Sequence, residues 1–160
     1  MKKILYLHGL ESSNVGDKID FLKKKAIVIA PSINYLKPSL EEELFYVVEK
    51  FSPDLIIGSS MGGFVGMALA NRYNIKCIAF NPAIHSRPIE PDLPSLKHDD
   101  VNFSFNPVVV LGLEDDVIDS AKTEDMLEQM DVECEIERVE GLGHRIPFDV
   151  FVNIYDKYVI

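Results

Sequence analysis

The chain has 160 residues, of which 47% are hydrophobic and 26% are charged, a composition typical of a globular domain with one core. Its net charge is −10 at pH 7, which argues against a nucleic acid or an anionic membrane surface as a partner, because no broad basic face is available. No apolar run reaches the length of a membrane span, and the short apolar stretch after Met1 has no cleavage site behind it. We therefore expect a cytoplasmic protein.

Strand-like and helix-like stretches alternate along the chain, which predicts a parallel sheet covered by helices on both faces. Apolar runs typical of strands lie at residues 3–8, 26–30, 54–58, 75–80, 108–113 and 134–139. Helices are predicted at residues 15–24, 39–51, 62–73, 120–130 and 148–158. The expected fold is thus an α/β fold of three layers with about six parallel strands. In such a sheet the ligand site lies beyond the carboxyl ends of the strands.

Local features refine several of these elements. The unbroken apolar run 26–30 is typical of a strand that is buried on both faces, whereas the alternating run 134–139 is typical of an edge strand. The cluster Lys23-Lys24-Lys25 ends a predicted helix, where it most simply offsets the helix dipole rather than forming a binding patch. Ser39 opens the next helix as its N-cap, with Glu42 three residues later to complete a capping box.

One long segment breaks the alternation. Between residues 83 and 106 the periodicity vanishes and prolines accumulate. The segment is longer than an ordinary connection, which suggests a lid or a binding loop. We expect a single domain, residues 1–160, in which this segment forms a short cap.

The stretch Gly58-Ser-Ser60-Met-Gly62 joins a predicted strand to a predicted helix. G-x-S-x-G in that setting is the nucleophile-elbow pattern, in which the turn holds the central hydroxyl above the sheet. Gly58 and Gly62 flank the serine because a Cβ at either position would collide with the neighbouring helix or strand. Ser60 is therefore the candidate nucleophile. The alternative is a turn that only packs tightly, or that binds a phosphate at the helix N-terminus.

A serine hydroxyl is a weak nucleophile until a base takes its proton, and the base in turn needs a carboxylate that orients it. The α/β-hydrolases place these groups in the order serine, acid, histidine. His144 follows the last predicted strand and is the candidate base. His85 and His98 lie in the proline-rich segment and precede the acidic turn, so they break this order.

The acid is expected in the turn that follows the strand at 108–113. Asp115 lies three residues past Gly112 and just before an apolar pair that would anchor the turn. It is preferred to its neighbour Asp116, which stays the alternative. Glu114 and Asp119 are expected to be solvated surface charges.

An oxyanion hole requires two preorganised backbone N–H groups. Met61, the residue after the nucleophile, should supply one of them, and Leu10, in the loop after the first strand, the other. Gly9 would allow this loop to approach closely, and His8 is expected to orient it. His8, Gly9 and Asn81 are the candidates for contact with the substrate, because they follow predicted strands at the edge where the ligand site is expected.

Three stretches together resemble one known family. They are Leu5-Tyr-Leu-His-Gly-Leu-Glu-Ser-Ser13, Ile57-Gly-Ser-Ser-Met-Gly-Gly63 and Phe80-Asn-Pro-Ala83. With these landmarks in order, nearly the whole chain resembles the small bacterial α/β-hydrolases of the YqiA-like esterase family. The resemblance implies a trimmed α/β-hydrolase fold, esterase-type activity on acyl esters, and Ser60, Asp115 and His144 as nucleophile, acid and base. Residues 83–106 match no motif of that family.

These observations predict a carboxylesterase-type serine hydrolase that cleaves short-chain carboxylic esters through an acyl-enzyme on Ser60. A thioesterase, a lactonase or a peptidase would use the same residues, and a non-catalytic binding protein of this fold is the alternative from another class. No metal or organic cofactor is expected, because no Cys/His cluster has ligand spacing and no glycine-rich phosphate motif occurs. Cys77 and Cys134 are expected to be core thiols in a reducing cytoplasm. The expected partner is a small ester, and the oligomeric state is left open.

Overall fold

The computed structural model describes residues 1–93 and 105–159. Within them, six parallel strands form one sheet in the order β2-β1-β3-β4-β5-β6. The strands are β1 (Lys3–Leu7), β2 (Ile27–Ile29), β3 (Leu55–Ser59), β4 (Lys76–Phe80), β5 (Val108–Gly112) and β6 (Glu135–Val139). The helices are α1 (Asp17–Lys25), α2 (Leu40–Phe51), α3 (Met61–Tyr73), α4 (Ser120–Gln129) and α5 (Phe148–Tyr158). The predicted α/β fold with a parallel sheet is confirmed.

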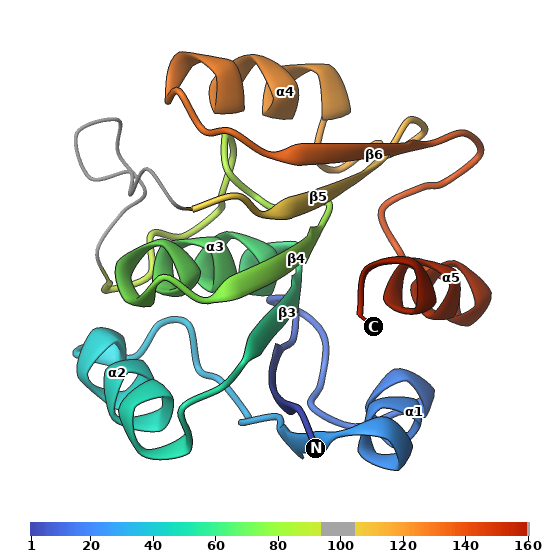
Figure 1. The fold of residues 1–160 in the computed structure, drawn as a ribbon. Helices are drawn as coiled ribbons and strands as arrows, with labels where there is room; N and C mark the ends of the chain where they lie inside the picture. Colours follow the sequence, from blue (N-terminus) through green and yellow to red (C-terminus); the bar gives the residue numbers. More distant parts are fainter. Residues whose placement is uncertain (94–104, 160) are drawn as a thin grey trace.

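Helices cover both faces of the sheet (Figure 1). α1 and α5 pack on one face, and α2, α3 and α4 pack on the other. Neighbouring strand residues alternate between the two layers: Ile4 and Ile57 belong to the cluster under α1 and α5, whereas Leu5 and Ile56 belong to the cluster under the other three helices. Since successive strand side chains point to opposite faces, a strand covered on both sides must be apolar at every position.

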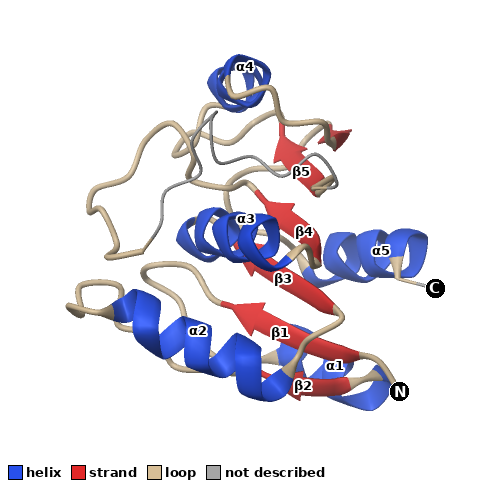
Figure 2. Cartoon of the chain, turned by 60° about the vertical axis from the view of Figure 1, so that its left-hand side comes forward, coloured by secondary structure: helices blue, strands red, loops and turns tan. Residues whose placement is uncertain are grey.

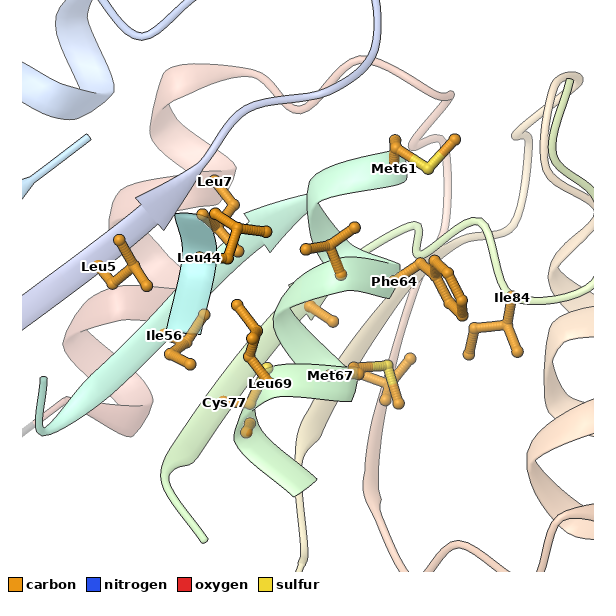
Figure 3. Packing of buried hydrophobic residues seen from close by; sticks show 14 of the residues in the cluster. Leu5, Leu7, Leu44, Ile56, Met61, Phe64, Met67, Leu69, Cys77 and Ile84 are labelled. Atoms are coloured by element: carbon orange, nitrogen blue, oxygen red, sulfur yellow. The ribbon is translucent and has the colours of Figure 1, made fainter. Parts of the chain in front are cut away.

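α3 is buried along almost its whole length, from Met61 to Asn71. Its small residues let it lie close to the strands: a Cβ on Gly66 would stand only 3.1 Å from the Ile56 side chain. Figure 3 shows this layer, in which Phe64 of α3 and Ile84 from the segment after β4 point toward one another. This close packing fixes the start of α3, and with it the preceding residue Ser60, against the sheet.

The predictions for the two edge strands of the sheet have opposite outcomes. β6 is an outer strand, as its alternation predicts. The prediction that the run 26–30 is buried on both faces is wrong, because Ile27 is 48% and Ile29 37% exposed, and β2 is an edge strand that pairs with β1 alone. A short apolar run does not reveal whether a further strand lies beside it.

The N-terminus of α2 is capped from a distant part of the chain, and the predicted capping box is wrong. Ser39 lies in the left-handed region with φ 60°, and its side chain makes no capping hydrogen bond. Asp92 supplies the acceptors instead: its Oδ2 accepts from Ser39 N at 2.7 Å and its carbonyl oxygen accepts from Glu41 N at 2.8 Å. Because Asp92 follows Ser39 by 53 residues, no local pattern identifies it.

This arrangement predicts different stabilities for two alanine variants. Asp92→Ala removes a carboxylate at a helix N-terminus and should lower the free energy of unfolding by about 1 kcal/mol. Ser39→Ala removes a hydroxyl that caps nothing and should change it by less than about 0.5 kcal/mol. Urea unfolding of both variants measures the difference. A larger loss for Ser39→Ala would restore the capping box and refute the cap by Asp92.

The segment expected to form a cap is described in its first part, residues 83–93. Arg87 holds this part together: Nη1 donates to the carbonyl oxygens of Ala83 at 2.9 Å and Ile84 at 2.5 Å, and the guanidinium lies 4.0 Å from the ring centroid of Phe64. With Asp92 at α2, the described part is thus fastened to two helices. Residues 94–104, which include His98, lie outside the described residues.

The two cysteines differ in how deeply they are buried. Cys77 and Cys134 are both free thiols. Cys77 is buried in β4, as expected, whereas Cys134 stands one residue before β6 and is only half-buried. Among the described residues, no helix combines the length and the apolar character needed to span a bilayer.

Candidate active site

The polar residues predicted to form the site follow strands that all run in the same direction. Figure 2 shows that the strand arrows point away from the side on which the two termini lie. The residues just beyond the carboxyl ends of β1, β3, β4, β5 and β6 are His8, Ser60, Asn81, Asp115 and His144. The sheet therefore gathers them along one edge, where α/β proteins bind ligands.

Ser60 occupies the turn between β3 and α3 in a strained conformation. Its φ of 55° and ψ of −116° lie where a non-glycine residue is rarely found, at a cost on the order of 1–3 kcal/mol. Three backbone hydrogen bonds hold it: Ser60 N donates to Phe80 O at 2.9 Å, and Ser60 O accepts from Ala83 N at 3.0 Å and from Phe64 N at 3.1 Å. This strained strand-to-helix turn has the geometry of a nucleophile elbow.

The glycines on either side of Ser60 make this turn possible. A Cβ on Gly58 would stand 2.1 Å from Gly62 O, in the first turn of α3. A Cβ on Gly62 would stand 2.1 Å from Leu7 O and 2.5 Å from His8 O, at the end of β1. The expected collisions with the helix and the strand are thus confirmed. The same close approach brings the start of α3 against the loop that follows β1.

Asp115 and His144 form a hydrogen-bonded pair. His144 Nδ1 and Asp115 Oδ2 are 2.8 Å apart, the carboxylate is fully buried, and the imidazole is 24% exposed. Asp115 Oδ1 accepts from the backbone N–H groups of Val117 and Ile118, both at 2.8 Å. Three groups therefore hold the carboxylate, and in the neutral tautomer that carries its proton on Nδ1 the other ring nitrogen, Nε2, is unprotonated. Within the described residues, Asp116 makes no hydrogen bond to His144.

Asn81 lies inside the protein rather than on a substrate-facing surface. Its side chain is 1% exposed, and its amide group is bonded to the backbone of Gly112, Gly143 and His144. The structure thus gives no free group of Asn81 for the predicted contact with a substrate.

Ser60 and His144 are not joined by a hydrogen bond in the described part of the chain. Hydrogen bonds between a nucleophile and its base are often long before the substrate binds.

His8 is also turned inward, where it holds the loop after β1. It is 4% exposed, and its Nε2 accepts from Ile33 N at 2.9 Å, so Nδ1 carries the proton and donates to Gly9 O at 2.6 Å. The Tyr35 hydroxyl donates to His8 O at 2.5 Å, and burial raises the pKa of Tyr35, which keeps the hydroxyl protonated. His8 therefore orients the loop. Its partners Ile33 and Tyr35 follow a different strand, and no sequence motif points to them.

The loop after β1 lies beside the nucleophile. A Cβ on Gly9 would stand 3.7 Å from Ser60 Cβ and 3.5 Å from Ser59 O. These are ordinary contact distances, so the position adjoins Ser60 without demanding a glycine. Across the described residues, the backbone N–H groups of Leu10 and Met61 donate no hydrogen bond.

A hollow of about 710 Å³ adjoins the buried acid. It is lined by residues of the segment after β4 and of α4, together with Asp115 and Asp116, but not by Ser60. His85 also lines it, and its Nε2 is buried without a hydrogen-bond partner among the described residues. Within residues 1–93 and 105–159, no group of three His, Cys, Asp or Glu side chains is arranged to hold a metal ion.

The fold is similar to that of solved hydrolase structures. A monoacylglycerol lipase from Paleococcus ferrophilus matches with a TM-score of 0.73 and 13% identity, over 97% of this chain and 93% of that chain. Esterase PE8 matches with a TM-score of 0.69 and 13% identity, over 98% and 90%. An alpha-beta serine hydrolase homologue from Coxiella burnetii matches with a TM-score of 0.66 and 13% identity, over 98% and 82%. These likenesses identify the fold as that of the α/β-hydrolases.

A family model extends this result to the sequence itself. The model of the uncharacterised protein family UPF0227 matches residues 3–104, which is more than half of the chain. The match includes the loop after β1 and the turn at Ser60, whereas Asp115 and His144 lie beyond it. The predicted resemblance to the YqiA-like family is confirmed, and the chain belongs to UPF0227.

Proposed function

We propose that the protein is a carboxylesterase-type serine hydrolase with Ser60, His144 and Asp115 as its catalytic triad. The observation that carries the proposal is the Asp115–His144 hydrogen bond of 2.8 Å, at the same sheet edge as a serine in a strained strand-to-helix turn. The acid and the base follow the serine in the α/β-hydrolase order. A turn that only packed tightly would need no buried carboxylate that accepts three hydrogen bonds beside a half-buried histidine.

In the proposed reaction Ser60 Oγ attacks the carbonyl carbon of the ester while Nε2 of His144 takes the hydroxyl proton. The negative charge that develops on the carbonyl oxygen is stabilised by the N–H groups of Leu10 and Met61. The intermediate then expels the alcohol, which receives its proton from His144 and leaves an acyl group on Ser60. Water, activated by the same imidazole, attacks this acyl-enzyme and releases the carboxylic acid.

Asp115 has two tasks in this scheme. Its carboxylate holds the proton of His144 on Nδ1, so that Nε2 is unprotonated when Ser60 must be activated, and it stabilises the imidazolium that forms. The two backbone donors from Val117 and Ile118 keep the carboxylate from rotating away. Thioesters, lactones and peptides are alternative substrates for the same residues. A non-catalytic binding protein of this fold is the alternative in which Ser60 is not activated.

Residues 83–106 are proposed to form a short cap on a single domain, and this predicts a preference for short acyl chains. In the described part of the cap, the apolar residues Ile84, Ile89 and Leu93 pack into the core cluster rather than line a tunnel. The mostly buried Arg87 forms an ion pair with the exposed Glu90. Each further acyl methylene contributes about 0.8 kcal/mol only while apolar wall remains to receive it.

A panel of p-nitrophenyl esters of graded acyl length tests both the activity and the cap. We expect wild-type kcat/KM to rise over the first few acyl carbons and to level or fall by medium chain length. Ser60→Ala is the control that separates enzymatic from background hydrolysis. Steady gains up to palmitoyl esters, measured below their micelle threshold, would contradict the short cap. No Ser60-dependent hydrolysis of any ester would contradict the proposed activity.

A further inference from the structure

Asn81, the first residue after β4, is buried between the loops that carry the candidate nucleophile and the candidate base. Its side chain is 1% exposed, and its φ of 42° lies in the left-handed region, which asparagine tolerates better than most residues. Its backbone N donates to Val110 O at 2.8 Å. The residue is therefore tied to β5 through its main chain, and its carboxamide is turned toward the loops beyond β5 and β6.

The carboxamide of Asn81 uses its donors and its acceptor on three backbone groups. Nδ2 donates to Gly143 O at 3.0 Å and to His144 O at 3.1 Å. Oδ1 accepts from Gly112 N at 2.8 Å. Among side chains that fit this space, a carboxamide alone provides two donors and an acceptor. An aspartate would place a second oxygen against two carbonyl oxygens.

The same stretch also holds the backbone of Ser60. Phe80 O accepts from Ser60 N at 2.9 Å, and Ala83 N donates to Ser60 O at 3.0 Å. Gly112, which donates to the carboxamide of Asn81, also accepts from Asp115 N at 3.2 Å. Residues 80–83 therefore connect directly to the nucleophile and to the base, and through Gly112 to the turn that carries the acid.

We infer that Asn81 is a positioning residue that sets the placement of His144 relative to Ser60. In the described part of the chain, no other side chain forms a hydrogen bond with the main chain of His144. Misplacement of a reacting group by about 1 Å can cost roughly 100-fold in rate, so the loss of these bonds should act on the chemical step. The inference rests on the proposed function. It replaces the expected contact of Asn81 with the substrate.

Two variants test this role with the backbone conformation preserved. Asn81→Gly removes the carboxamide and keeps the left-handed conformation accessible. Asn81→Asp keeps the size of the side chain and removes both donors. We expect each to lower kcat at least about tenfold and to leave KM within about twofold, because Asn81 touches no substrate. Asn71→Asp is the matched control: Asn71 is 7% exposed, but it lies near the far end of α3 from Ser60.

A second readout does not require a substrate. The proton that His144 Nδ1 shares with Asp115 should give a downfield NMR resonance, identified by its loss in His144→Gln. We expect this resonance to shift or broaden in both Asn81 variants and to stay unchanged in Asn71→Asp. A folded Asn81→Gly with wild-type kcat and an unchanged resonance would overturn the inference. If the wild-type protein cleaves no ester, the proposed function fails, and the resonance still decides the role of Asn81.

If both variants unfold, hydrogen exchange of side-chain amide protons in the wild-type protein still tests the inference. The two Nδ2 protons of Asn81 should exchange at least about tenfold more slowly than those of the exposed Asn153, because both are bonded and buried. Equal exchange rates would show that the carboxamide is not held by the His144 loop and would overturn the inference.

Discussion

Ser60→Ala should lower kcat for a short p-nitrophenyl ester by at least about four orders of magnitude, and His144→Ala should do the same. The double variant should be little worse than either single variant. The reason is that the hydroxyl and the imidazole act as one unit: once either is absent, no activated nucleophile remains for the other to assist. Steady-state kinetics of the three variants and the wild type measure these losses.

Ser59→Ala is the matched control for these variants. Ser59 is the last residue of β3 and directly precedes the candidate nucleophile, but it does not lie at the apex of the turn. We expect its kcat to stay within a few-fold of the wild type. Losses for Ser60→Ala and His144→Ala that add up in the double variant would mean that the two residues act independently, and would contradict the triad.

Asp115→Asn should lower kcat by roughly three to four orders of magnitude, because a carboxamide cannot replace the hydrogen bonds of this carboxylate. In the structure one oxygen of Asp115 faces His144 Nδ1, and the other accepts from the N–H groups of Val117 and Ile118. If the new NH2 group faces His144, Nδ1 must accept, and Nε2 then carries the proton and cannot activate Ser60. If it faces the two backbone N–H groups, donors meet donors.

Asp116→Asn is the control for this prediction, with the same chemical change one residue away. It should change kcat by no more than a few-fold, because Asp116 makes no hydrogen bond to His144 within the described residues. Circular dichroism of both variants shows whether the fold is retained. A larger loss for Asp116→Asn than for Asp115→Asn would move the acid to the neighbouring position and contradict the proposed triad.

The parts of the fold that were predicted from the sequence depend on local patterns. The alternation of strands and helices and the turn around Ser60 follow from periodicity and from glycines within a few residues. The edge position of β2 and the cap on α2 depend on contacts between distant segments. Ile27 is apolar whether or not other residues pack over it, and β2 is apolar whether or not a further strand pairs with it. The cap by Asp92 forms only when the segment after β4 folds against α2.

In the candidate site, too, local patterns predict some features, and others depend on contacts between distant segments. Position after a strand predicts that His8 and Asn81 lie at the carboxyl edge of the sheet, but it does not predict which way their side chains point. Both turn inward to backbone groups of other loops, Ile33 for His8 and Gly143 for Asn81. Asp115 was a clearer prediction because its anchoring donors are its own neighbours in the sequence, two and three residues later.

The central claim is that Ser60 is activated for nucleophilic attack, and covalent labelling with a fluorophosphonate tests it most directly. An activated serine displaces fluoride and forms a stable phosphonyl ester, which intact-mass and peptide mass spectrometry locate. We expect one adduct, on Ser60, that forms quickly in the wild-type protein and in Ser59→Ala, is absent from Ser60→Ala, and forms far more slowly in His144→Ala. A folded wild-type protein that is not labelled, or a Ser60 labelled equally fast without His144, would contradict the account.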